Sequence, residues 1–463
     1  MATLSSPGIG SGLDVNGLVS RLMTVEQQPL VAMQKTEASY QAKLSAFGTL
    51  KGALSDLQNA VSALTSATAF SPMSTSLSDT TVMTASASSS AAAGTYAITV
   101  GQLAQAQVLR SATPYAATTE TFNTGTISIS VGGATATQVT ISASNNTVAG
   151  IRDAINNANA GVAATIVNDG TTNRLLLTSN TTGLTAGAIS VTVTDSGVGG
   201  IHALTELDGP SLVTVKPPLD ATFNVNGLSI TRSSNTVSDV ISGVTFNLTK
   251  AGSIASPVST QLTVARNTSS VQGLLTSFVT AYNGAIKQIK SLSAYNAETK
   301  QASILTGNAA VRGLQSQLAS LAQSAVTGVA GGIGRLSDIG ITVQKDGSLA
   351  LDAAKVQAAL TDPTKDVATL FTSTTAGNTG IAVRFKDSLT TLLGSTGPLA
   401  SSTDGINRSI SDLRKREDAF QTRLVSIEAR YRRQFSALDG MVSSMQQTST
   451  YLTQQLANLP STK

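Results

Sequence analysis

The feature that most constrains the fold of this chain is a long heptad pattern near its C-terminus. Two interleaved series of apolar residues stay in phase with a seven-residue repeat: Ile410, Leu424, Tyr431, Leu438, Met445, Leu452 and Leu459, and Ile406, Leu413, Phe420, Ile427 and Met441. Interleaved series of this kind are typical of the two core positions of a coiled coil. The pattern predicts a long helix that packs along another helix, of the same chain or of a partner.

Polar residues interrupt this pattern at two points. Glu417 and Gln434 stand at core-type positions, and Phe435 beside Gln434 indicates a shift of phase. Such a shift bends a coiled-coil helix or moves it to another partner, so we expect one of these near Gln434. Basic residues cluster at 414–418 and 430–433, where acidic neighbours favour ion pairs between helices over nucleic-acid binding.

The heptad spacing also occurs in earlier segments. Core-type positions fall within residues 40–64, 271–292 and 311–321. The uncharged run 313–334 is interrupted by glutamine, serine and glycine, so a bundle helix fits it better than a membrane span. Helical segments therefore stand on both sides of the middle of the chain.

Between about residues 73 and 270 the pattern changes to short alternating runs separated by Gly, Asn, Asp and Ser, which predict β-strands. Asn226-Gly227 predicts a type I′ hairpin, because both central residues of that turn need positive φ. Short helices are expected near 147–155 and 236–244, and the Asn-Thr-Val that starts each suggests a weak internal repeat. Residues 123–222 contain no aromatic residue, which indicates two distinct β modules.

The segment 336–371 predicts a hairpin with Asp346-Gly347 as its turn, then helices capped at Asp352 and Asp362, with Pro363 at a first helical position. Together these patterns predict an α+β multidomain protein. A discontinuous helical or coiled-coil domain is formed by the N- and C-terminal parts, with two inserted mainly-β domains. The expected boundaries are 1–40 and 430–463 for terminal coiled-coil legs, 41–72 and 271–429 for a helical bundle domain with a β-hairpin, 73–122 and 208–270 for an inner β domain, and 123–207 for an outer β domain.

The N-terminal stretch "SSPGIGSGLDVNGLV" places Gly8, Gly10 and Gly12 directly before a helical pattern. A dinucleotide-binding fingerprint is excluded, since Leu13 stands where its third glycine is needed and no predicted strand precedes it. Asp14 is a good N-cap, and Leu13 and Leu18 are spaced as a hydrophobic staple. The apolar residues Val15, Leu18, Val19, Leu22 and Met23 recur at helical spacing. The glycines then form a flexible lead-in, although a frayed tail before an ordinary surface helix fits these residues equally well.

Composition excludes several classes of function. The chain has no cysteine and one histidine, which excludes disulfides, thiolate zinc sites and cysteine nucleophiles and leaves little for acid–base chemistry. The formal net charge of +4 over 463 residues does not indicate nucleic-acid binding. No cleavable signal and no membrane span stands out. We expect no catalytic residues, no metal, no cofactor, no nucleic acid and no membrane insertion.

The single histidine, His202, lies near Glu206 and Asp208, which permits a hydrolase or metal hypothesis. No G-x-S-x-G nucleophile elbow accompanies it, and one histidine with two nearby carboxylates is a poor ligand set. A loop histidine between β elements is the better prediction.

Four stretches resemble the flagellar filament cap family, also called hook-associated protein 2 or FliD. They are "SPGIGSGLDVNGLVSRLM" at the start, "SFVTAYNGAIKQIKSL" from 277, "LSDIGITVQKDGSLALD" from 336 and "RYRRQFSALDGMVSSMQQTSTYLTQQLA" from 430. "NTVAGIRDAINNANAGVAATIV" from 146 resembles a module of flagellar axial proteins. The rival interpretation within the structural class is a hook–filament junction protein or a flagellin-like subunit.

The resemblance implies a non-enzymatic protein that is secreted unfolded through the flagellar type III export channel. It implies a ring homo-oligomer, a pentamer in the commonest case, at the distal tip of the filament, where it helps flagellin fold and insert and prevents loss of flagellin monomers. Flagellin, the hook–filament junction proteins and an export chaperone are the implied partners, and adhesion through the Ser/Thr-rich modules is compatible with capping. The residues that match the terminal legs, which would make the oligomer and filament contacts, are Gly8, Gly10, Gly12, Leu13, Asp14, Leu18, Leu22, Tyr431, Phe435, Leu438, Met445, Tyr451 and Leu452.

Overall fold

The structure, a computed structural model, describes residues 14–457. Its contacts divide the chain into two units, one made of the residues up to Phe70 with those from Val271 onward and the other of Ser71–Ser270. The first unit is mainly helical and the second is built of β-sheets. The α+β class is confirmed, with helices from both ends of the chain packed together and a β-rich middle. The finer division into four parts stays a prediction.

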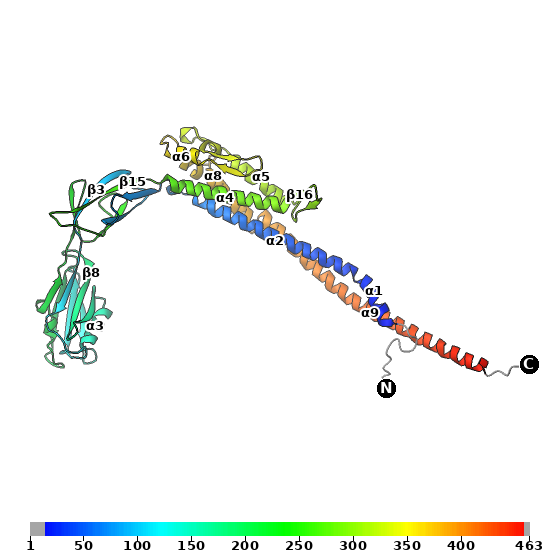
Figure 1. Cartoon of the computed structure of the whole chain (residues 1–463), viewed down its shortest axis with the longest axis horizontal. Helices are drawn as coiled ribbons and strands as arrows, with labels where there is room; N and C mark the ends of the chain where they lie inside the picture. The colour runs from blue at the N-terminus through cyan, green and yellow to red at the C-terminus, as the bar shows by residue number, and fades with distance from the viewer. Residues whose placement is uncertain (1–13, 458–463) are drawn as a thin grey trace, which may run out of the picture. The chain divides into compact units, whose positions relative to one another are not determined.

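In the helical unit, α2 lies beside both α8 and α9, although these helices are far apart in the sequence (Figure 1). Its helices are α1 (Val15–Glu26), α2 (Gln28–Ala63), α4 (Thr268–Ser293), α5 (Ala309–Gln323), α6 (Ala353–Thr361), α7 (Val367–Thr372), α8 (Ile381–Leu393) and α9 (Pro398–Ala457). Short hairpins pair β16 (Tyr295–Asn296) with β17 (Gln301–Ala302) and β18 (Ile341–Val343) with β19 (Leu349–Leu351).

The core of this unit is built from the heptad positions. Phe47, Leu54 and Val61 of α2 are buried with Leu275 and Tyr282 of α4 in one hydrophobic cluster. The prediction for these segments is confirmed, because residues spaced by seven return to the same face of a helix. The helix expected within 313–334 is shorter than the uncharged run: α5 ends at Gln323, and the remaining residues form a loop.

The hairpin predicted around Asp346-Gly347 is present, with Gly347 at φ 81°. Asp352 caps α6 by accepting a hydrogen bond from the backbone N–H of Lys355 at 3.1 Å, as predicted. The prediction that Asp362 caps the next helix is wrong. Its carboxylate accepts a bond from Thr364 N–H at 2.9 Å, which closes a turn around Pro363, and Asp366 caps α7 instead.

In the β unit, two sheets enclose an inner core. One has the order β1-β15-β3-β11-β12 and the other β13-β14-β2. Their strands are β1 (Met73–Leu77), β2 (Met83–Ala87), β3 (Gly94–Gln102), β11 (Ala221–Val225), β12 (Leu228–Arg232), β13 (Thr236–Val237), β14 (Val244–Leu248) and β15 (Val258–Arg266). Asn226 and Gly227 both have positive φ between the paired strands β11 and β12, so the predicted I′ hairpin is confirmed.

The short helix expected at 236–244 is wrong. Val237 pairs with Phe246 in the β13–β14 ladder, and the Asn235 side chain binds the backbone of Ala104 at 2.8 and 2.9 Å, which fixes the start of this segment as strand, and residues 239–243 form bends and a turn. At the other Asn-Thr-Val, Thr147 does cap a helix. The two Asn-Thr-Val segments therefore differ in structure, one starting a helix and the other a strand.

An outer core lies under two further sheets, ordered β10-β4-β8-β7 and β6-β5-β9, with the helix α3 (Val148–Asn157). The strands are β4 (Ala106–Ser111), β5 (Gly125–Val131), β6 (Thr137–Ile141), β7 (Val162–Asn168), β8 (Asn173–Thr182), β9 (Ile189–Asp195) and β10 (Leu212–Lys216). Tyr115 and Phe122 are the large side chains at its centre, with ring centroids 5.3 Å apart.

Candidate functional site: the terminal helices

The helix α1 begins where the sequence predicts. The Asp14 side chain accepts a hydrogen bond from Gly17 N–H at 2.8 Å and so satisfies one of the free donors of the first turn. Val15, Val19 and Met23 are buried. Because they recur every four residues, they form one stripe along α1.

This stripe packs against α9. Val15, Val19 and Met23 form a small hydrophobic cluster with Leu424 and Ile427, which Phe420, Tyr431 and Phe435 extend. The heptad series of α9 therefore meets a helix of the same chain over this stretch. Past Phe435, no apolar side chain of the described part of α9 is buried.

Polar contacts flank the cluster. The Tyr431 hydroxyl donates to a Glu26 oxygen at 2.9 Å, and Arg432 donates to the Asn16 side chain at 3.1 Å and to Glu428 at 2.7 Å. The predicted ion pairing of the two basic clusters is confirmed in part. Arg432 pairs within α9, and Arg414 pairs across to Glu37 of α2 at 2.7 Å.

Two of the predicted contact residues lie on the rim of this cluster. Leu18 and Leu22 are 37% and 38% exposed, one position along the helix from the buried stripe. Val25, which the sequence analysis did not select, continues their line and is also exposed. Its helical spacing from Leu18 and Leu22 is the signal that could have identified it.

The end of α9 has a different character. Residues 440–457, named the α9 tail here, contain no charged residue. The large apolar side chains Met445 and Leu452 are 65% and 54% exposed, and Tyr451 is exposed as well. Leu438, which lies just before the tail, is also exposed. α9 continues as one helix through Gln434 into the tail, beyond the start of α1 (Figure 1). The α9 tail is thus a helix with an apolar face available to another protein.

The remaining predicted contact residues, Gly8, Gly10, Gly12 and Leu13, lie outside the described residues. The hydrophobic staple between Leu13 and Leu18 therefore stays a prediction. Leu456, at the end of the α9 tail, is an exposed apolar residue that was missed. It is four residues after Leu452, on the same helical face.

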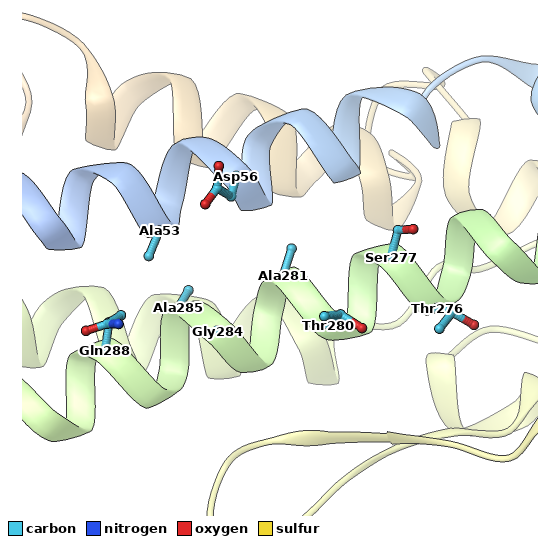
Figure 2. Close-up of a pocket in the computed structure, with 9 residues that line it drawn as sticks. All are labelled: Ala53, Asp56, Thr276, Ser277, Thr280, Ala281, Gly284, Ala285 and Gln288. Carbon is cyan, nitrogen blue, oxygen red and sulfur yellow. The ribbon is translucent and has the colours of Figure 1, made fainter.

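A groove of about 520 Å³ lies between α2 and α4 (Figure 2). Small side chains dominate its lining: Ala53, Asp56, Thr276, Ser277, Thr280, Ala281, Gly284, Ala285 and Gln288. Asp56 is the charged member of this set. The groove therefore holds one titratable side chain and no second one to form an acid–base pair with it.

His202 lies between β elements, as predicted. Its ring nitrogens face Glu120 at 3.0 Å and Glu206 at 3.3 Å, and its ring packs on Tyr115 and Phe122. Each ring nitrogen faces a different carboxylate, Nε2 that of Glu120 and Nδ1 that of Glu206. The three side chains therefore do not point at a common position that a metal ion could occupy. Within residues 14–457, no three His, Asp or Glu side chains are arranged to hold a metal ion, and no helix there has the length and apolar character to cross a membrane.

Comparison with known proteins decides the family. The model of the flagellar hook-associated protein 2 N-terminus matches residues 11–107, and that of its C-terminus matches residues 219–447. Flagellar hook-associated protein 2 of Escherichia coli (strain K12) is 36% identical over 478 residues, covering 100% of both chains. The chain belongs to the flagellar hook-associated protein 2 family. Between the two terminal matches, residues 126–181 match the flagellin hook IN motif, as the resemblance of the segment from 146 suggested.

Other members of the hook-associated protein 2 family agree with this assignment. The B-type flagellar hook-associated protein 2 of Pseudomonas aeruginosa PAO1 is 33% identical over 476 residues, covering 98% of each chain. The crystal structure of the flagellar cap protein FliD D1-D2-D3 domains from E. coli superposes with a TM-score of 0.66 at 36% identity, covering 78% of this chain and 99% of that one. The family forms the cap of the flagellar filament, outside the cell at the filament tip, and is structural rather than enzymatic.

Proposed function

We propose that the chain caps the growing flagellar filament as a ring homo-oligomer, a pentamer, and that α1 and the α9 tail are the legs that contact the filament end. In this role it promotes folding and insertion of flagellin beneath the ring and prevents loss of flagellin monomers. Hook–filament junction proteins and an export chaperone are its further proposed partners.

The observation that carries this proposal is the exposed apolar face of the α9 tail. Leu438, Met445 and Leu452 continue the heptad that Leu424 begins, but they are exposed where Leu424 is buried. A heptad helix gains most of its stability by burying this face against a neighbour. Because the family caps the filament, we propose that this neighbour is a helix of flagellin at the filament end.

The symmetry of the ring also requires the legs to adapt to neighbours that differ from subunit to subunit. A ring whose rotational symmetry differs from that of the helical filament cannot make identical contacts at every subunit. One position then stays open for the next flagellin, and the legs adjust to unequal neighbours. A single residue, Gln27, separates α1 from α2 and marks where this leg joins the bundle helix.

Removal of each leg tests the proposal. Chains lacking residues 2–29 or 431–463 are expressed in cells without the wild-type protein, and the flagella are labelled with gold-coupled antibody against residues 123–222. We expect tip label and filament length to fall with either deletion, while the full chain labels distal tips alone. Amounts of each chain in cells and in the medium separate failed export from failed retention.

The same labelling separates the rival structural interpretations. Label along the filament would indicate a flagellin-like subunit, and label at its base a junction protein. Normal tip label and filament growth with both deletions would contradict the leg proposal. Adhesion through residues 123–222 remains a prediction of the sequence, to be measured as binding of the full chain to host cells.

A further inference from the structure

The seam between α2 and α9 carries acidic side chains from both helices. The inward positions of α9 follow one another at steps of three and four: Ile406, Ile410, Leu413, Glu417, Phe420, Leu424 and Ile427. Those of α2 are Leu30, Met33, Glu37, Tyr40, Leu44 and Phe47. Glu417 and Glu37 are the only acidic members of these two series, and their carboxyl groups interact across the seam.

Arg414 is the cation beside these two carboxylates. Glu37 Oε1 accepts bonds from Arg414 Nε at 2.7 Å and from Gln41 Nε2 at 2.9 Å. Glu417 is 8% exposed, and its Oε1 atom finds no hydrogen-bond donor among the described residues. A buried carboxylate oxygen without a donor disfavours the closed seam whenever the group is ionised.

The groups facing Glu417 are Glu37 from α2 and Arg414 and Asp418 from α9 itself. Burial, followed by the negative charges of Glu37 and Asp418, raises the pKa of Glu417. A carboxyl group whose pKa is raised on folding stabilises the fold fully below its ordinary value, and this contribution is lost as the pH rises through the raised value. Protonation of Glu417 therefore favours the closed seam.

The acidic pair also lies between two hydrophobic clusters. Val15, Val19 and Met23 with Leu424 and Ile427 form the cluster on one side, and the bundle core, which begins at Ala46 and Phe47 on α2, forms the other. Neither cluster contains Glu37 or Glu417. The acidic pair therefore separates the two clusters along the seam, and one cluster can loosen while the other stays packed.

We propose that Glu37 and Glu417 form a proton-dependent joint, at which α1 and the part of α9 beyond Glu417 open and close independently of the helical bundle. With Glu417 ionised the joint is loose, and with Glu417 protonated it is closed. Its use rests on the proposed capping function, since legs with a joint can meet unequal neighbours under a ring.

Hydrogen–deuterium exchange of the isolated full chain tests the joint. The wild type is compared with Glu417→Leu, which makes the inward series of α9 wholly apolar, and with Glu417→Gln, which removes the charge alone. The matched control is Asp412→Asn on the exposed face of α9, where Asp412 pairs with Lys415 at 3.9 Å. Dividing variant by wild-type rates at one pH cancels the intrinsic pH dependence of exchange.

We expect Glu417→Leu to slow exchange within residues 418–431 by about tenfold at pH 8 and by far less at pH 5, because an apolar replacement relieves a buried charge. Glu417→Gln shifts the rate in the same direction, and Asp412→Asn leaves it unchanged. The proposal of a joint would be overturned if Glu417→Leu slowed exchange equally at pH 5 and pH 8. It would also be overturned if Asp412→Asn slowed exchange as much as Glu417→Leu does. Failure of capping in cells leaves this measurement unaffected, so the two proposals fail separately.

Discussion

The two stretches of α9 on either side of Gly440 share one heptad phase but differ in charge and in partners. Up to Phe435, charged residues flank a seam that α1 and α2 bury within the same chain. After it, the α9 tail has no charged residue, and Met445 and Leu452 are exposed. The apolar repeat alone therefore does not tell an internal partner from an external one.

The charges make that distinction. Charged side chains beside a two-helix seam stay in water and form ion pairs such as Arg414 with Glu37. A helix enclosed on several sides has no water for such groups, and charge is depleted at the centres of protein interfaces. The α9 tail has the composition of a helix that becomes enclosed on assembly.

Truncating one leucine in each stretch gives the largest expected contrast. Leu424 is buried between α1 and α9, so Leu424→Ala costs about 2–4 kcal/mol in the opening free energy of this region. Leu452→Ala changes it by less than about 0.5 kcal/mol, since the side chain is exposed. Hydrogen exchange of α1 and of α9 before Gly440 measures both. Equal losses of opening free energy in Leu424→Ala and Leu452→Ala would contradict the proposed difference between the two stretches of α9.

The cap of α1 provides a smaller effect. Asp14→Ala removes the bond to Gly17 N–H and destabilises α1 by about 1 kcal/mol, with faster exchange in Val15–Glu26. Asp14→Ser retains a capping oxygen and is the control. If hydrogen exchange of α1 is the same in Asp14→Ala as in the wild type, packing on α9 alone would determine where α1 begins.

Two tyrosines sharpen the comparison further. Tyr431→Phe deletes the hydroxyl that donates to Glu26 and costs about 0.5–1 kcal/mol in the same opening free energy. Tyr451→Phe, in the exposed tail, leaves it unchanged. A measurable loss at Tyr451 in the isolated chain would indicate an internal partner for the tail.

Much of the helical unit could be predicted because heptads encode a face directly. Phe47, Leu54, Leu275 and Tyr282 were placed in a core by spacing alone, and Asp14 and Asp352 were placed as caps by residue type. These signals are local, so one sequence suffices to find them.

One error arises where a tertiary contact overrides a local signal, and the other where two local signals compete. At 236–244 the pairing of Val237 with Phe246 and the Asn235 amide on Ala104 hold strand geometry against a helix-like pattern. Asp362 and Asp366 are both good caps, and the turn that Asp362 closes with Thr364 decides between them. Strand pairing such as that of Val237 with Phe246 is not encoded in local spacing.

The acidic joint could be predicted only in part. Glu417 at a core-type position is visible in the sequence, but Glu37 opposite it depends on the register of two helices 380 positions apart. The same limit applies to His202, whose partner Glu120 lies 82 positions away. Long-range register has no signal in a single sequence.

The most direct test of the account places charge on the α9 tail. Met445→Lys with Leu452→Lys adds two charges to its apolar face, and Ser411→Lys with Gln421→Lys adds two at exposed positions before Gly440 as the matched control. Gold labelling of filament tips measures retention, and unfolding of the purified chains checks that both variants fold as the wild type does. We predict that tip retention falls by about tenfold or more for the tail variant and stays at the wild-type level for the control, as expected for a buried contact face. Wild-type retention of the tail variant would contradict the assignment of the α9 tail as the surface that joins the cap to the filament.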